Sequence, residues 1–211
     1  MNDNIIEFKT KEEMYEEARA MLELPEKASE GYSKMKKLAD SGYDRAVYVV
    51  ARCLSEGTGV EKNQSAAFGL MFEYAYDCEQ PRAYMTLGKY YEDGIGTEKN
   101  EQNAVTLYKT ATDYYYPPAF IELARCYRKG IFVPVNQKKA FALDMMAANF
   151  DYCLGMFHVA LHYINGDGVE RDPRMAYYWL TKASDAGSTQ ATKMLHEIQM
   201  RRAEREKITA K

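Results

Sequence analysis

The sequence lacks any long apolar run, and this absence argues against a membrane-spanning helix. No stretch approaches the ~18 continuous apolar residues that such a helix needs. The first 30 residues also show no run typical of a secretion signal, because Ile5, Ile6 and Phe8 are interspersed with Asn, Asp, Glu and Lys. We therefore expect a cytoplasmic protein that does not bind membranes.

Cysteine is scarce as well, at 4 of 211 residues. A small secreted disulfide scaffold is much richer in cysteine than this chain. We therefore expect reduced, unpaired thiols at all four positions, which are Cys53, Cys78, Cys126 and Cys153.

The chain has no excess of positive charge and no recognisable catalytic motif. Its net charge is -3 and its pI is near 5.8, which argues against binding to a nucleic-acid backbone. The patterns G-x-x-x-x-G-K, G-x-S-x-G and H-E-x-x-H do not occur. Ser33 and Lys36 match S-x-x-K, but the partner motifs S-D-N and K-T-G are missing, so we interpret the match as chance. We expect no enzyme activity and no cofactor.

What the sequence does have is a repeat of about 36 residues. Its glycines Gly57, Gly94, Gly130 and Gly166 follow one another at intervals of 37, 36 and 36. A period in this range is typical of stacked helical units that form a solenoid with an extended binding surface. The four copies open with the segments AVYVVARCLSEGTG, AYMTLGKYYEDGIG, AFIELARCYRKGIF and GMFHVALHYINGDG.

Each copy predicts a helix, a loop and a second helix. We number the positions of a copy as slots, starting from its first small residue, which is Ala46, Ala83, Ala119 or Gly155. Slots one, five and nine lie on one helical face. The glycine of slot twelve ends the first helix. An N-cap follows six residues later and opens a second helix with a narrow, alanine-bearing face; the four N-caps are Asn63, Asn100, Asn136 and Asp172.

These residues resemble the Sel1-like repeat, a relative of the tetratricopeptide repeat. The nearest copy runs from Gly155 to Gly187 and includes Gly166-Asp167-Gly168-Val169 and Trp179-Leu180. The resemblance implies an all-α, right-handed solenoid of antiparallel helix pairs, forming one domain over residues 1–211 with roughly ten to twelve helices. The expected parts are a divergent unit at 11–45, repeats at 46–82, 83–118, 119–154 and 155–190, and a C-terminal capping helix at 191–207.

Two connections depart from the repeat pattern. The third copy has Phe132 where the other copies have the second glycine of Gly-x-Gly. Tyr115 stands where the last copy has Gly187. Because side chains disfavour the left-handed conformation, we expect both connections to adopt different turns.

The resemblance also implies that the first helices line a concave groove, with slots four, seven, eight and eleven facing a partner. Slot seven holds Arg52, Lys89 and Arg125, a positive ladder suited to an acidic partner. The alternative is pairing within each helix, of Arg52 with Glu56 and of Lys89 with Asp93. Arg125 is followed four residues later by Lys129 instead of an acid, so we expect its charge to be uncompensated.

Tyrosine is abundant, with 18 residues, and provides apolar area and a hydroxyl at a low entropic cost. Tyr90 and the loop cluster Tyr114, Tyr115 and Tyr116 are therefore candidate contact residues, although packing between repeats is the alternative. His158 and His162 lie four residues apart, and Glu122 and Cys126 occupy the same slots one copy earlier. These four residues could bind zinc, but ordinary packing explains them as well.

The sequence therefore predicts a non-enzymatic adaptor that binds a protein or peptide in its concave groove. The alternative is a small-molecule- or metal-responsive binding protein that uses the region of Glu122, Cys126, His158 and His162. The sequence predicts neither the identity of the partner nor the oligomeric state.

Overall fold

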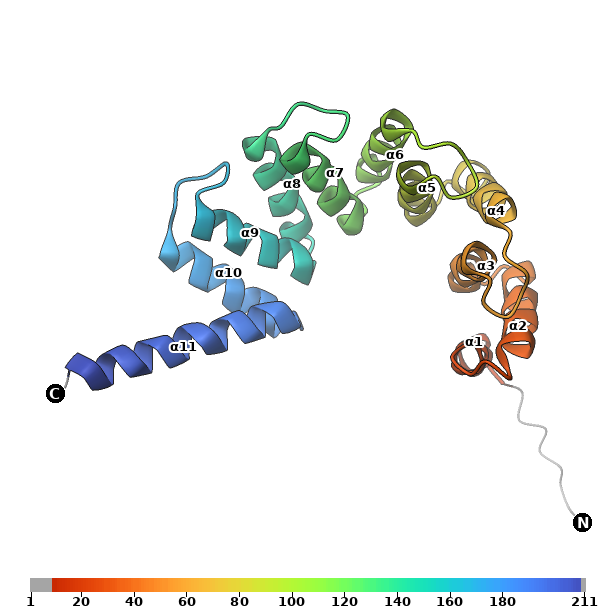
Figure 1. Cartoon of the computed structure of the whole chain (residues 1–211), viewed down its shortest axis with the longest axis horizontal. Coiled ribbons are helices and arrows are strands. Elements are labelled where there is room, and N and C mark those ends of the chain that lie inside the picture. The colour runs from red at the N-terminus through yellow and green to blue at the C-terminus, as the bar shows by residue number, and fades with distance from the viewer. Residues whose placement is uncertain (1–8, 210–211) are drawn as a thin grey trace, which may run out of the picture. The chain divides into compact units, whose positions relative to one another are not determined.

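The computed structural model describes residues 9–209, which form eleven helices and no strand. The chain divides into two compact units, Met1–Asn100 and Glu101–Lys211, and each unit is described by itself. Within each unit the helices pack in chain order, each against the next, as Figure 1 shows. This arrangement confirms an all-α solenoid.

Unit 1 contains the first five helices. They are α1 (Lys11–Leu22), α2 (Ala28–Asp40), α3 (Asp44–Glu56), α4 (Gln64–Tyr76) and α5 (Pro81–Asp93). The pair α1 and α2 lies within the range 11–45 for which the sequence predicts a divergent first unit. Its core joins that of the next copy, because Ala18 and Met35 pack with Val50 and Cys53 of α3 in one apolar cluster.

Unit 2 contains the other six helices. They are α6 (Glu101–Asp113), α7 (Pro117–Lys129), α8 (Gln137–Asn149), α9 (Cys153–Asn165), α10 (Pro173–Asp185) and α11 (Thr189–Thr209). The long α11 includes the predicted cap, and its Ala191, Met194, Leu195 and Ile198 pack against the cluster that contains Trp179.

The small residues of the repeat bring the helices close together. Ala46, Ala83 and Ala119 at slot one are completely buried. At Gly155 an added Cβ would lie 2.7 Å from Cβ of Ala147 and from the backbone nitrogen of Ala148, both in α8. A larger side chain at slot one would therefore push α9 away from α8.

The predicted helix ends are confirmed where the structure describes their caps. The side chains of Asn63 and Asn136 each accept a hydrogen bond from a backbone N–H three residues later, at 2.9 Å, and Asp172 accepts from Arg174 and Met175. The backbone N–H of each capping residue also donates to the carbonyl of slot nine, as in the 2.9 Å bond from Asn136 to Tyr127. The loop is thus attached to both helices that it connects.

The expectation that two connections adopt different turns is wrong. Phe132 has a φ of 53°, close to the 76° of Gly168 at the equivalent position, and Tyr115 has a φ of 55° where Gly187 has 91°. Backbone hydrogen bonds stabilise both connections, including Tyr115 N–H to the Thr112 carbonyl at 2.9 Å. A left-handed residue with a side chain costs about 1–2 kcal/mol, so we infer that these contacts outweigh the local cost.

None of the four cysteines forms a disulfide, and Cys53 and Cys126 are buried. Among residues 9–209, no helix is both long enough and apolar enough to cross a membrane.

Candidate functional site

We call slots four, seven, eight and eleven of the four copies the first-helix face, because they lie on α3, α5, α7 and α9. The structure divides these slots by exposure. Slot eleven is exposed and slot seven is exposed or half-buried in every copy, whereas slot eight is buried in every copy. A partner can therefore reach slots seven and eleven, while slot eight packs between helices; its residues are Cys53, Tyr90, Cys126 and His162.

Tyr90 is consequently not the exposed contact residue that the sequence suggests. Its side chain is only 7% exposed. Burial raises the pKa of Tyr90 above its ordinary value. A buried ring fits packing within the solenoid, which is the alternative to contact with a partner.

Arg52 and Lys89 carry the positive charge of slot seven in unit 1. Arg52 is exposed and forms no ion pair with any residue in the described range 9–209, so the expected pairing with Glu56 does not occur. Lys89 is half-buried. Because Arg125 belongs to unit 2, the ladder of three cations stays a prediction.

Arg125 was expected to be uncompensated, and this expectation is wrong. Its Nε lies 2.8 Å from Oε2 of Glu122, one turn earlier on α7, and both side chains are largely buried. The compensating acid stands three positions before Arg125, not four positions after it. The exposed cation of this face on α7 is instead Lys129.

The loop between α6 and α7 presents aromatic rings to solvent. Tyr114 and Tyr115 are 43% and 64% exposed, whereas Tyr116 is half-buried at the N-terminus of α7. The ring of Tyr115 lies 6.0 Å from that of Phe150, which is also exposed. These rings form a small aromatic patch in unit 2 that a partner can reach.

The two histidines of α9 both contact Asp144, which lies on α8 and is completely buried. His158 Nδ1 lies 3.2 Å from Oδ1 of Asp144, and His162 Nε2 lies 2.9 Å from Oδ2. Arg128 of α7 forms an ion pair with the same carboxylate. Burial raises the pKa of Asp144, but the hydrogen bonds from the histidines and the charge of Arg128 outweigh it and hold the pKa below its ordinary value.

His162 is held from both sides of its ring. Its Nδ1 lies 2.6 Å from the backbone carbonyl oxygen of Asp167, and its Nε2 faces the carboxylate of Asp144. One of these oxygen atoms belongs to α8 and the other to the loop that follows α9. The ring therefore connects α8, α9 and the loop that follows α9.

A hollow of about 160 Å³ opens over this network. Its walls include one residue from each slot of the first-helix face in the fourth copy, namely His158, Leu161, His162 and Asn165, together with Arg128 and Asp167. Apolar, amide, imidazole and guanidinium groups thus surround one depression. Such a mixture can accept one side chain of a peptide and form hydrogen bonds with its backbone.

The structure does not assemble the four-residue metal site considered from the sequence. His158 and His162 contact Asp144, and Glu122 pairs with Arg125. Within residues 9–209 no group of three or more histidine, cysteine, aspartate or glutamate side chains is arranged to bind a metal ion.

Asp144 is the residue that the sequence reasoning missed, although a signal was present. In the repeat register it aligns with Met71, Tyr108 and Leu180, which are large and completely buried. A carboxylate at a buried slot needs partners from neighbouring helices. That requirement, read together with the two histidines one helix later, would have predicted the network.

The comparisons with known proteins agree with this architecture. A family model described as Sel1 repeat matches residues 44–73, 81–113, 118–143 and 153–188. No curated protein matches the chain.

Several solved structures share the fold. The chain is similar to a Sel1 repeat protein from Oxalobacter formigenes, with 23% identity and a TM-score of 0.72 over 90% of this chain and 78% of that one. It is also similar to an immunity protein from Pseudomonas aeruginosa, with 21% identity and a TM-score of 0.63 over 86% and 67%. A third is cysteine rich protein B from Helicobacter pylori, with 18% identity and a TM-score of 0.51 over 63% and 95%. At these identities the likeness concerns the fold.

Proposed function

Because this chain belongs to the Sel1 repeat family, whose members are generally scaffolds for protein interactions, we propose that it is a non-enzymatic adaptor in the cytoplasm. It binds a peptide or protein segment on the first-helix face. The observation that supports this proposal is the hollow in unit 2, whose walls include all four slots of that face in the fourth copy.

The partner segment carries at least one apolar side chain and some negative charge. Leu161 gives the hollow an apolar wall. The exposed Lys129 on α7, in the same unit, is a cation that an acidic segment can meet. Exposed charges of this kind change the association rate and its salt dependence more than the affinity.

A photo-crosslinking amino acid at position 161 tests the site even when the partner is unidentified. Met146, an exposed apolar residue on the second helix α8, is the matched control position. In cells of the native host, we expect one protein to be captured from position 161 and not from position 146. Equal capture from both positions, or capture from position 115 alone, would place the site elsewhere.

The affinity of the captured partner gives the second measurement. Leu161→Glu should weaken binding at all salt concentrations, because it introduces a charge into the hollow. Lys129→Glu should weaken binding mainly at low salt, since exposed charges are screened beyond about 10 Å at 0.1 M. Met146→Glu should leave the affinity unchanged.

A further inference from the structure

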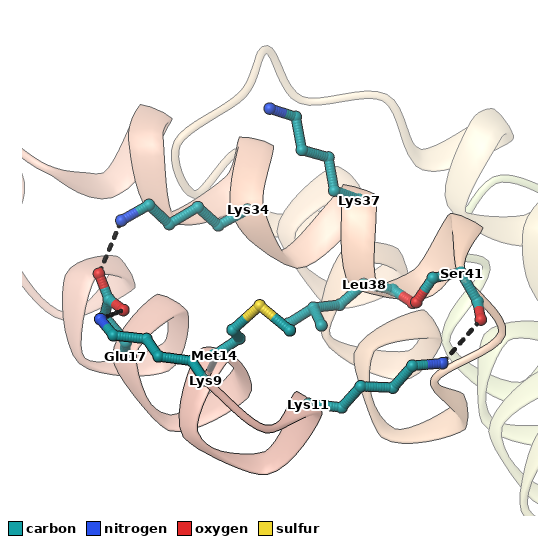
Figure 2. A pocket seen from close by; sticks show the side chains of 8 residues that line it. All are labelled: Lys9, Lys11, Met14, Glu17, Lys34, Lys37, Leu38 and Ser41. Atoms are coloured by element: carbon teal, nitrogen blue, oxygen red, sulfur yellow. Dashed lines mark hydrogen bonds and ion pairs between the residues drawn. The ribbon is translucent and has the colours of Figure 1, made fainter. Parts of the chain in front are cut away.

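A pocket of about 490 Å³ lies between α1 and α2 in unit 1, outside the first-helix face. Figure 2 shows the side chains that line it. Met14 of α1 and Leu38 of α2 meet at its centre and form an apolar floor. A volume of this size is within the range of sites that bind small ligands or several side chains of a peptide.

The rim of the pocket is strongly cationic. Four lysines line it, from both helices and the segment before α1, against the single carboxylate of Glu17: Lys9, Lys11, Lys34 and Lys37. Glu17 lies 2.6 Å from Lys9 Nζ and 2.7 Å from Lys34 Nζ. These two contacts lower the pKa of Glu17 to about 2. The negative charge of Glu17 is therefore paired with Lys34 and Lys9.

The other two lysines form no ion pair with the residues that the structure describes. Nζ of Lys11 donates to the carbonyl oxygen of Ser41 at 3.0 Å, a neutral acceptor. Lys37 forms no ion pair with any residue in the described range 9–209, and no contact marked in Figure 2 involves it. Two ammonium groups on different sides of an apolar floor are therefore available to a ligand.

The repeat register shows that this end of the array is unusual. In the other four copies the residue three positions after the small residue of the second helix is apolar, and in α2 the same position is Lys34. The four apolar residues are Leu70, Leu107, Leu143 and Trp179. The pocket between α1 and α2 thus has a polar rim and an apolar floor. Such a surface suits a charged ligand better than packing against another helical repeat.

We propose that this pocket binds a short acidic peptide segment of a partner protein, with one or two apolar side chains between carboxylates. The apolar side chains contact Met14 and Leu38, and the flanking carboxylates meet Lys11 at one side and Lys37 at the other. Because the cations lie on different sides of the floor, a ligand with several carboxylates matches them better than a fatty acid with one.

The experiment uses the full chain and a labelled pool of hexapeptides with two central residues chosen from Leu, Ile, Phe and Met, flanked on both sides by Asp or Glu. We expect saturable binding by fluorescence anisotropy that weakens as salt rises. We also expect the methyl NMR signal of Met14 to shift on binding, while that of the buried Met71 stays in place. The Met14 signal is assigned by its loss in Met14→Leu.

Charge reversal localises the binding. The double variant Lys11→Glu, Lys37→Glu should weaken it about tenfold, because it removes two attractions between exposed charges and adds repulsion in their place. All the changed side chains are exposed, so the fold should persist. The matched control is Lys62→Glu, Lys99→Glu, which changes the net charge of unit 1 equally in two exposed loops away from the pocket and should have little effect.

Four outcomes would overturn the proposal. The first is no saturable binding of the pool, and the second is equal weakening in the two double variants. The third is a Met14 shift with laurate but not with the peptides, which would assign the pocket to a fatty acid. The fourth is binding only after removal of residues 1–8, which would make the chain's own N-terminal segment the occupant. Because the residues differ from those of the first-helix face, failure here leaves the function proposed above untouched.

Discussion

Nε2 of His162 lies 2.9 Å from Oδ2 of Asp144, and both side chains are almost completely excluded from solvent. The same carboxylate contacts His158 of α9 and forms an ion pair with Arg128 of α7. One acid on α8 therefore joins three consecutive helices of unit 2. The floor of the hollow at the first-helix face depends on this network.

The first prediction concerns the loss of that acid. Asp144→Asn keeps the volume but leaves Arg128 and two histidines without their anion. Removing one partner from a buried pair costs about 3–5 kcal/mol, so we expect a loss of that order in the free energy of unfolding measured with urea. Asp113→Asn, at an exposed position on α6, is the control and should stay within about 0.5 kcal/mol of the parent. Similar losses in both variants would mean that the network does not stabilise unit 2.

The second prediction concerns pH. The folded-state pKa of Asp144 is lowered, so its contribution is fully present above the unfolded value of about 3.9 and is lost as pH falls through the lower folded value. The difference in unfolding free energy between the parent and Asp144→Asn should therefore shrink as the pH falls below about 4. A difference that grows on acidification would contradict the lowered pKa.

The third prediction compares two left-handed glycines. An added Cβ at Gly168 would lie 2.2 Å from the backbone oxygen of Gln137, whereas at Gly187 nothing lies within 4 Å. Gly187→Ala should therefore lose only the conformational term of about 1–2 kcal/mol. Gly168→Ala should lose clearly more, because the loop must also move away from α8. Equal melting temperatures would show that this close approach is not required.

The fourth prediction tests the helix boundary at the third copy. Asn136→Ala removes the side-chain acceptor of the Lys139 N–H and should cost about 0.5–2 kcal/mol. Asn149→Ala, at the exposed last residue of the same helix, should be close to neutral. Urea unfolding of both variants gives the comparison. If Asn136→Ala leaves the free energy of unfolding unchanged, Asn136 is not the N-cap of α8.

The fifth prediction concerns the C-terminal cap. A chain ending at residue 190 lacks the side chains of α11 that cover the Trp179 cluster, and we expect aggregation or a clearly lower melting temperature. Removal of residues 202–211 alone should leave the melting temperature nearly unchanged. Most side chains of that segment lie outside the described residues, and Ile198 is the last one packed on the cluster. A stable, monomeric chain ending at residue 190 would contradict the capping role.

The sequence determined the fold of this protein to a large extent. Glycine at slot twelve, Asn or Asp six residues later and alanine at the packing slots act locally, through backbone conformation and hydrogen bonds within one or two turns. Gly57 and Asn63 therefore have the same roles in the structure as in the sequence. Local rules failed at Tyr115 and Phe132, because hydrogen bonds and packing outweigh about 1–2 kcal/mol of local cost.

Only the tertiary structure decided which charged and aromatic residues are available to a partner. Tyr90 is buried at slot eight, and Arg125 is paired with Glu122. Asp144 contacts two histidines and an arginine from neighbouring helices. The cationic rim of the pocket between α1 and α2 likewise depends on the positions of the lysine ammonium groups. Exposure and ion pairing depend on distances between helices, and periodicity in the sequence specifies the face of a helix but not what lies opposite it.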